Sequence, residues 1–333
     1  EISSVPKPIL SGIKAVASDV DGTLTSPEGK VSARTKSTIK AIMDEGLVFF
    51  PATGKTRAGM YAVLGDQLGA ELKAKDVPGV FIQGLIVYSG AGDDVLYERL
   101  LELDVIKAVT NFCRDRGMSV IAYSGDRIVC SKRDEQTDKI TDYLEPTPEA
   151  IGSLEEAAAG GLPIHKLILM DTTENIDDVR PEVERLVGDV ATLTQCMLST
   201  LQLDCTATSV NLVSQVQGPC SHMHRFSPPS LILLGMCLQA LSDMLEVLPL
   251  GASKGKGVAV LLEHLGIDPR HLMAMGDAEN DVGMLQLAGI GVCMGNASPA
   301  AIAAADYVTL SNKENGAAVA METLLGVITS KSK

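Results

Sequence analysis

Short apolar segments that stop abruptly at polar clusters constrain the fold of this chain more than any other feature. The run Ile13-Lys-Ala-Val-Ala-Ser18 stops at Asp19-Val-Asp-Gly-Thr23. Similarly, Leu47-Val-Phe-Phe-Pro-Ala52 stops at Thr53-Gly-Lys-Thr-Arg57. Apolar runs of this length, followed by turn-forming residues, predict buried β-strands that end in polar loops.

The same pattern returns near the C-terminus, where residues 271–276 lead into Asp277-Ala-Glu-Asn-Asp281 and residues 289–294 lead into Gly295-Asn-Ala297. Between the first two strands, residues 35–45 have the apolar spacing of a helix. Strands that alternate with helices and deliver polar residues at their C-terminal ends are typical of a parallel α/β sheet. We therefore expect a Rossmann-like, three-layer core with a site along that edge of the sheet.

The middle of the chain lacks these polar motifs and predicts a second domain. Strand-like and helix-like segments follow one another there: 85–88, 95–99, 104–116, 119–123, 127–130 and 164–170. This mixture favours an α+β cap domain inserted into the first domain. We expect a core of residues 1–84 and 248–333 and a cap of residues 85–247.

Residues 196–239 fit neither pattern. Their 44 positions hold only two charged residues, Asp204 and Arg225, and four of the seven cysteines. The flanking segments 191–195 and 240–249 would join smoothly without them. We interpret the segment as an irregular insertion in the cap, either a disordered loop or a gene-model artefact such as translated intron sequence.

Composition excludes several classes of protein. The 333 residues carry a net charge of −14, which argues against wrapping nucleic acid or lying on an anionic membrane. No apolar run reaches the length of a membrane span. Seven cysteines without a CxxC motif favour a reducing compartment over a disulfide framework. Because the first residue is Glu1 rather than Met, we expect that upstream residues were removed by processing or by the choice of where the sequence starts.

Asp19 and Asp21 lie two residues apart at a strand end, so an extended backbone points both side chains the same way. A carboxylate that attacks phosphorus must be stripped of competing water and held beside a divalent cation, and a second carboxylate nearby can protonate the leaving oxygen. Gly22 permits a close backbone approach, and Thr23 adds a hydroxyl group. A capped turn is the alternative interpretation of these residues.

Asp277, Asn280 and Asp281 form an oxygen-rich cluster after another strand. Mg²⁺ keeps several waters and takes few protein carboxylates, so the cluster suits this ion. A polar loop with a helix N-cap is the alternative.

Thr53, Gly54 and Lys254 are candidate phosphate-binding residues. Thr53 offers a hydroxyl donor beside the flexible backbone of Gly54. Lys254, at a predicted helix start, offers a positive charge and donors to a phosphate or to the carboxylate that attacks it. Taken singly, each is more often an ordinary loop or surface residue. The motifs follow one another in order along the chain, and each lies at the end of a predicted strand or helix. The set is therefore a far more specific sign of phosphate chemistry than any single residue in it.

These motifs together resemble the four ordered motifs of the haloacid dehalogenase (HAD) superfamily: Asp19-Val-Asp-Gly-Thr23, Thr53-Gly54, Lys254 and Gly276-Asp277-x-x-Asn280-Asp281. Further stretches are similar to its Cof-type branch: Gly251-x-Ser-Lys-Gly-x-Gly257, Met294-Gly-Asn-Ala297 and Ala304-Ala-Asp306. The likeness covers nearly the whole chain except residues 196–239. The middle, including Gly79-Val-Phe-Ile-Gln-Gly84 and Met170-Asp-Thr-Thr173, also resembles the HAD-type domain of plant plastid proteins.

The resemblance implies a phosphatase with a cap between its second and third motifs. It implies that Asp19 attacks the phosphoryl group to form an aspartyl-phosphate, and that Asp21 protonates the leaving alcohol and then activates water. It also implies a Mg²⁺ ion held by Asp19, the carbonyl of Asp21 and Asp277. Asn280 and Asp281 would support this site.

The resemblance further implies that Thr53, the Gly54 amide and Lys254 neutralise the phosphoryl oxygens. One residue departs from the family pattern, because Lys55 stands where Arg often follows the second motif. Lysine keeps the charge but loses the bidentate geometry of arginine, which puts any substrate contact there in doubt.

We therefore expect hydrolysis of a small phosphorylated metabolite such as a sugar phosphate, FMN or pyridoxal phosphate, in the chloroplast or cytoplasm, with neither nucleic acid nor membrane as partner. A phosphomutase on sugar phosphates and a non-catalytic binding module on the same fold are the alternatives. Zinc binding by the cysteines and histidines of residues 196–239 is a weaker hypothesis, because their spacing matches no common zinc template.

Overall fold

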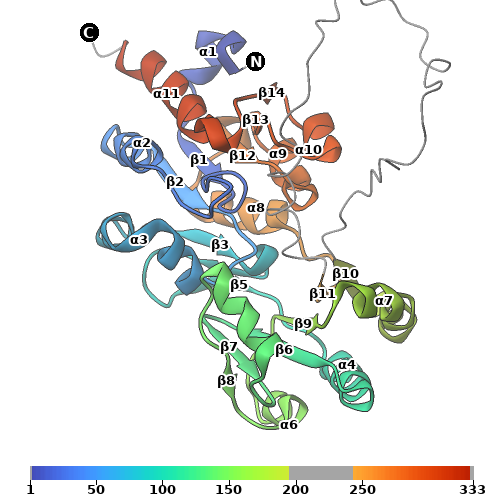
Figure 1. The fold of residues 1–333 in the computed structure, drawn as a ribbon. Coiled ribbons are helices and arrows are strands. Elements are labelled where there is room, and N and C mark those ends of the chain that lie inside the picture. The colour runs from blue at the N-terminus through green and yellow to red at the C-terminus, as the bar shows by residue number, and fades with distance from the viewer. Residues whose placement is uncertain (1, 195–242, 331–333) are drawn as a thin grey trace, which may run out of the picture.

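A five-stranded sheet forms the centre of the core. The computed structural model describes residues 2–194 and 243–330. The strands pair in the order β14-β13-β12-β1-β2, and every pair is parallel (Figure 1). Their bounds are β1 Ala15–Ser18, β2 Val48–Pro51, β12 Leu272–Gly276, β13 Ile290–Cys293 and β14 Tyr307–Val308. The predicted parallel α/β core is confirmed.

Helices cover both faces of this sheet and make a three-layer sandwich. Buried residues of α2 and α11 share one apolar cluster with Val16, while those of α8, α9 and α10 share another with Ala15 and Ala17. Because successive strand residues point to opposite faces, the two clusters lie on opposite sides of β1. These helices are α2 Ala33–Asp44, α8 Lys254–Leu265, α9 Val282–Leu287, α10 Pro299–Ala304 and α11 Gly316–Thr329. The remaining α-helices of residues 2–84 are α1 Lys7–Leu10 and α3 Arg57–Ala74.

The helix predicted over residues 35–45 starts slightly earlier, at Ala33. The hydroxyl of Ser32 accepts a hydrogen bond from the Thr35 amide at 3.1 Å, which satisfies a free N–H group of the first turn. Gly46 follows the helix with a φ of 80°, a backbone conformation that only glycine adopts without strain.

A small antiparallel sheet connects core and cap. Its strands are β3 Gly79–Phe81, β4 Ile86–Tyr88 and β5 Val95–Glu98, in that order. A parallel bridge from Val80 to Ala52 joins the sheet to the loop after β2, and all three strands pack against α8. The strands expected near 85–88 and 95–99 are thus present, and they lie beside the core. The domain boundary between core and cap at residues 84/85 stays a proposal.

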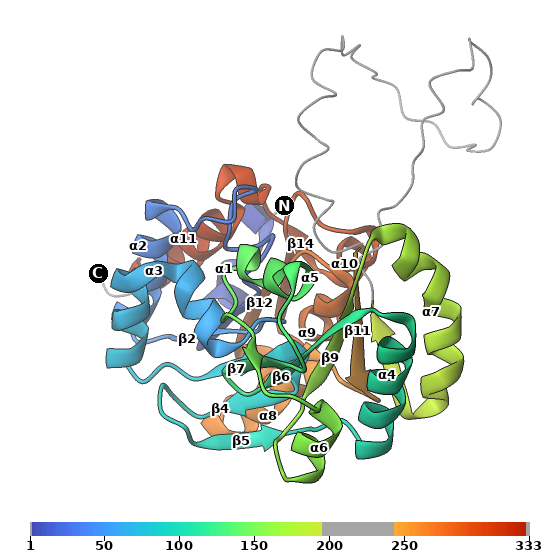
Figure 2. The ribbon, with the colours of Figure 1, turned by 60° about the horizontal axis from the view of Figure 1, so that its bottom comes forward.

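The cap is built on a six-stranded sheet in the order β10-β11-β9-β6-β7-β8. Its strands are β6 Ser119–Ser124, β7 Arg127–Cys130, β8 Glu149–Ala150, β9 Lys166–Met170, β10 Ala191–Thr194 and β11 Met244–Pro249. The accompanying helices are α4 Leu103–Arg116, α5 Glu135–Asp138, α6 Leu154–Ala159 and α7 Thr173–Val187. α4, α6 and α7 cover one face of the sheet (Figure 2). Residues of the other face, including Ile121 and Ile168, join the apolar cluster that contains Ile82 and Leu85, so this face is turned toward the core.

β10 and β11 are antiparallel neighbours, with Thr194 opposite Glu246. The proposed insertion, residues 196–239, lies outside the described residues, between these two strands. The proposed domain limit at 247/248 falls within β11, and it also stays a proposal. No helix in the described ranges is long and apolar enough to cross a lipid bilayer.

Candidate active site

The polar loops after the core strands meet at one edge of the sheet. β1, β12 and β13 are parallel neighbours, so the residues that follow them emerge on the same side. Asp19 follows β1, Asp277 follows β12, and Asn296 lies beyond β13. Thr53 follows β2 on the other side of β1. The neighbourhood predicted from the strand ends is therefore present.

Lys254 links the first and last motifs. It is the first residue of α8, and only 1% of its side chain is exposed. Its Nζ lies 2.7 Å from Asp19 Oδ1 and 2.8 Å from Asp281 Oδ1. Burial acts to lower the pKa of Lys254, but the two carboxylates outweigh it and raise the pKa, so the ammonium stays charged.

Asp281 is fully buried and holds the loop that follows β12. Its Oδ2 accepts hydrogen bonds from the amides of Asp277 (2.9 Å) and Ala278 (3.0 Å), while Oδ1 accepts from Lys254. A Cβ atom at Gly276 would lie 2.5 Å from the Asp281 side chain, so this position requires glycine. Both carboxylate oxygens of Asp281 are therefore engaged by the protein itself.

Asp277 faces the loop after β1. Its Oδ1 accepts a hydrogen bond from the Thr23 hydroxyl at 2.9 Å. Gly22 has a φ of 79°, and a Cβ atom there would lie 2.3 Å from Asp277 Oδ2, so only glycine permits this approach. Asn296 donates to the carbonyl of Gly22 at 3.0 Å and closes the loop from the β13 side.

The carboxylates of Asp19, Asp277 and Asp281 fit a divalent cation. Each offers an oxygen, and these oxygens lie within 4.8 Å of one another. Burial, followed by the charge of Asp281, raises the pKa of Asp277 to about 6. Burial also raises the pKa of Asp19 well above its usual range, although Lys254 opposes this. A cation would offset the surplus negative charge, and the engagement of Asp281 favours Asp19 and Asp277 as its carboxylate ligands.

Asp21 lies on the cap side of this cluster, beside Lys55. Its side chain is 56% exposed, and its Oδ2 lies 3.3 Å from Lys55 Nζ. The same Lys55 ammonium donates to the carbonyl of Tyr143, a cap residue, at 2.5 Å. Lys55, which replaces the arginine common in the family, therefore joins Asp21 to the cap.

Thr53 and Gly54 lie between the core and the cap. Thr53 is buried, and its Oγ1 accepts a hydrogen bond from the Lys55 amide at 3.2 Å, which leaves the hydroxyl proton available to a ligand. The carbonyl of Gly54 lies 3.4 Å from the Nζ of Lys166 in the cap. Gly54 also packs closely on Gln83, because a Cβ atom at Gly54 would lie 2.7 Å from Gln83 Nε2.

Sequence reasoning missed Gln83 as a site residue. Its Oε1 accepts a hydrogen bond from Asn280 Nδ2 at 2.9 Å, so it connects the second motif to the fourth. Gln83 has a φ of 59°, which is unusual for a residue other than glycine, asparagine or aspartate. The available signal was its place after the apolar run 79–82, the pattern that marks the other motifs. Asn296 was missed in the same way.

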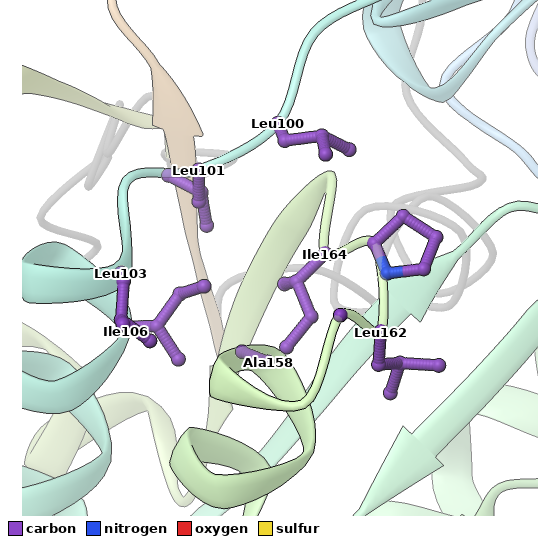
Figure 3. A pocket seen from close by; sticks show the side chains of 9 residues that line it. Leu100, Leu101, Leu103, Ile106, Ala158, Leu162 and Ile164 are labelled. Atoms are coloured by element: carbon purple, nitrogen blue, oxygen red, sulfur yellow. The ribbon is translucent and has the colours of Figure 1, made fainter.

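A hollow in the described residues lies elsewhere, in the cap (Figure 3). It measures about 140 Å³ and is lined by apolar side chains, among them Leu101, Ile106 and Ile164. None of the candidate site residues lines it, and it brings no catalytic group. The candidate site residues lie instead at the edge of the core sheet.

Comparison with known proteins agrees with this geometry. A family model described as haloacid dehalogenase-like hydrolase matches residues 16–223 and 229–321. A solved structure of a haloacid dehalogenase-like hydrolase from Bacteroides thetaiotaomicron is similar in fold, with a TM-score of 0.72 and 23% identity. That alignment covers 93% of this chain and 98% of the other.

Two curated relatives align with most of this chain. The chloroplastic endoribonuclease YBEY of Arabidopsis thaliana is 34% identical over 308 residues, which are 91% of this chain and 45% of that protein. This chain thus spans less than half the length of that relative. The 5-amino-6-(5-phospho-D-ribitylamino)uracil phosphatase YwtE of Bacillus subtilis is 22% identical, over 94% of this chain and 98% of its own length.

Proposed function

Because this chain belongs to the haloacid dehalogenase-like hydrolases, we propose that it is a magnesium-dependent phosphatase acting on small phosphorylated metabolites. One observation carries the proposal: the buried ammonium of Lys254 bridges Asp19 and Asp281 beside Asp277, while Asp21 is exposed and pairs with Lys55. Two aspartates only two residues apart thus have different surroundings, as a nucleophile and an acid–base group require.

In the proposed mechanism, a carboxylate oxygen of Asp19 bonds to phosphorus while the bond from phosphorus to the leaving oxygen breaks. Asp21 gives its proton to that oxygen and releases the alcohol. Asp21 then takes a proton from water as the water oxygen attacks phosphorus. The bond to Asp19 breaks, and inorganic phosphate leaves.

The other site residues bind and orient the phosphoryl group. Lys254, the Thr53 hydroxyl and the Gly54 amide would neutralise its oxygens, where the charge of the transition state develops. Asp281 positions Lys254, and Asn280 positions Gln83. Asp19, the carbonyl of Asp21 and Asp277 would hold Mg²⁺, which supplies charge stabilisation when bound.

The relatives support a small-molecule substrate and a plastid location. The name of YwtE specifies a phosphorylated ribityl compound as the substrate of that enzyme. The Arabidopsis relative is chloroplastic, and we propose the chloroplast for this chain, with the cytoplasm as the alternative. The endoribonuclease name belongs to that longer protein.

Phosphate release tests the proposal. We expect the protein with Mg²⁺ to release phosphate from p-nitrophenyl phosphate and from members of a panel of sugar and polyol phosphates, nucleotides, FMN and pyridoxal phosphate. Isomerisation of a sugar phosphate without phosphate release would indicate a mutase instead. Absence of release from every compound would refute the proposal.

A further inference from the structure

The turn that follows β3 has an unusual backbone. Three consecutive residues have positive φ angles: 50° at Ile82, 59° at Gln83 and 84° at Gly84. A positive φ suits glycine, but it is uncommon for glutamine and an outlier for a β-branched residue such as isoleucine. Strained backbone of this kind persists only where surrounding contacts fix it, and it concentrates at functional sites. The turn is therefore a candidate part of the active site.

The second motif holds this turn from one side. The amide of Ile82 donates a hydrogen bond to the carbonyl of Lys55 at 3.0 Å. The amide of Gln83 donates to the carbonyl of Thr53 at 3.1 Å. The backbone that carries Gln83 is thus attached to the loop that we assign to the phosphoryl oxygens.

The start of α8 holds the turn from the other side. A Cβ atom at Gly84 would lie 2.2 Å from the carbonyl oxygen of Ser253, the residue before Lys254. A Cβ atom at Gly257 would lie 3.1 Å from the Cα atom of Gly84. Because these close approaches leave little room for a side chain, the turn has a fixed position between the second and third motifs.

The side chain of Gln83 is oriented by the fourth motif. Its Oε1 accepts the hydrogen bond from Asn280 Nδ2 at 2.9 Å, so the Nε2 branch is directed away from Asn280. A Cβ atom at Gly54 would lie 2.7 Å from Nε2, which places this nitrogen beside Gly54. Gln83 is half-buried, and its Nε2 donates to no acceptor within residues 2–194 and 243–330. The N–H groups of Nε2 are therefore oriented, and a ligand can use them.

A phosphoryl group suits these donors. Its non-bridging oxygens are acceptors, and they need donors as charge develops on them in the transition state. The charged carboxylates of Asp19 and Asp277 are acceptors themselves and supply no donor. Gly54, whose amide we assign to a phosphoryl oxygen, is the residue against which Gln83 Nε2 packs. The oriented amide thus lies where the site needs a further donor.

We propose that Gln83 is a further phosphoryl-binding residue, and that its Nε2 donates a hydrogen bond to a non-bridging oxygen beside the Gly54 amide. Asn280 acts through Gln83 and is a positioning residue. The inference rests on the proposed phosphatase function and adds a residue to its binding site. The alternative is a purely structural link, in which only Oε1 matters because it joins Asn280 to the turn.

Calorimetric titration with inorganic phosphate in the presence of Mg²⁺ tests the proposal on two variants. Gln83→Met removes the donors at nearly the same side-chain length, whereas Gln83→Glu keeps an oxygen for Asn280 and replaces the donors with a second carboxylate oxygen. We expect the Kd for phosphate to rise by about tenfold to a hundredfold in Gln83→Met, the effect of losing a hydrogen bond to a charged group. Gln83→Glu should bind phosphate at least as weakly, because its carboxylate also repels the anion. In both variants, kcat/KM on p-nitrophenyl phosphate should fall by at least the same factor.

Gln67 provides the matched control, because it is an exposed glutamine on α3. Gln67→Met and Gln67→Glu should change neither the Kd for phosphate nor kcat/KM.

Gln83→Gly gives a readout that separates binding from folding. Glycine adopts a φ of 59° without strain, so the melting temperature measured without phosphate should not fall. The Kd for phosphate should nevertheless rise as in Gln83→Met. A purely structural link predicts the reverse, a lower melting temperature and an unchanged Kd.

A double-mutant cycle tests the role of Asn280. Asn280→Ala should raise the Kd for phosphate in the parent, but it should add less than about twofold in Gln83→Met, because no side-chain amide is left to orient. Additive losses would show that Asn280 does not act through Gln83.

A Kd for phosphate within about twofold of the parent in Gln83→Met or in Gln83→Glu would overturn the inference. A parent without measurable affinity for phosphate would overturn it too. Failure of the proposed function is a different result: the parent would bind phosphate, and the Gln83 variants would bind it more weakly, but no ester would release phosphate.

Discussion

Replacement of Lys254 by alanine is the most direct perturbation of the site. The change removes the only ammonium that an ion pair or hydrogen bond places on Asp19 or Asp281 within residues 2–194 and 243–330. Asp19, Asp277 and Asp281 would then face one another without compensation. Turnover would lose a preorganised charge beside the phosphoryl oxygens.

The structure sets the expected magnitudes. Removal of one partner from a buried ion pair costs about 3–5 kcal/mol of folding free energy. Burial already raises the pKa of Asp277 to about 6, so proton uptake would relieve part of the repulsion, and we expect about 3 kcal/mol. Loss of a preorganised donor at developing charge lowers kcat by roughly 10²–10³-fold.

The assay is steady-state hydrolysis of p-nitrophenyl phosphate with Mg²⁺, together with thermal unfolding of the same proteins in the absence of Mg²⁺. We expect kcat to fall by at least about 10²-fold, to roughly 1% of the parent value or less, and the melting temperature to fall by roughly 5–10 °C. Lys256→Ala is the control, because Lys256 lies in the first turn of the same helix and is exposed. If Lys254→Ala kept kcat within about twofold of the parent and only raised KM, Lys254 would not be a catalytic residue.

Asp19→Asn should abolish turnover while the fold persists, because an amide is a poor nucleophile; release from p-nitrophenyl phosphate within about tenfold of the parent would refute the covalent mechanism. Exhaustive dialysis against EDTA should remove activity, and added Mg²⁺ should restore it; full activity in a sample free of metal by elemental analysis would contradict the metal requirement. Deletion of residues 196–239, which joins Gln195 to Ala240, should leave activity and melting temperature unchanged. The reason is that β10 and β11 pair with each other, and closing a loop costs only about 0.6 kcal/mol for each doubling of its length. A deletion variant that fails to fold would show that the segment is integral to the cap. Burial lowers the pKa of His165, so the unfolded chain binds a proton at this histidine more tightly than the folded chain, and the free energy of unfolding should fall as the pH drops below the unfolded pKa of about 6.5. Urea unfolding of the parent and of His165→Gln between pH 5 and 7.5 should show a weaker pH dependence of this free energy in the variant, and an equal pH dependence would contradict the prediction.

The core sheet was predictable because its signal is local. Each of its longer strands is a short apolar run, and a strand buried on both faces needs such a run. Parallel strands connected by helices bring their C-terminal ends to one edge, so Asp19, Thr53 and Asp277 were expected to meet there. The HAD likeness follows from the same motifs, and the match of the family model confirms it.

The partners of these residues were not predictable in the same way. Lys254 was expected to donate to a phosphate or to the attacking carboxylate, and it lies against Asp19, but nothing in the sequence predicts Asp281 as its second partner. Gln83 was overlooked because glutamine at a strand end is an ordinary loop residue until Asn280 is placed beside it. From the sequence, we assigned the strands β4 and β5 to the proposed cap. In the structure they pair with β3 and lie beside the core.

The amino-acid sequence by itself determined the fold class, the strand ends that carry the motifs and the charged residues available to them. These follow from periodicity and turn chemistry, which act over a few neighbouring residues. Only the tertiary structure decided that Lys166 lies between Glu246 and Gly54, which are 80 and 112 residues away in the chain. Such contacts depend on sheet order, strand register and the packing of the cap on the core, and no local pattern specifies them.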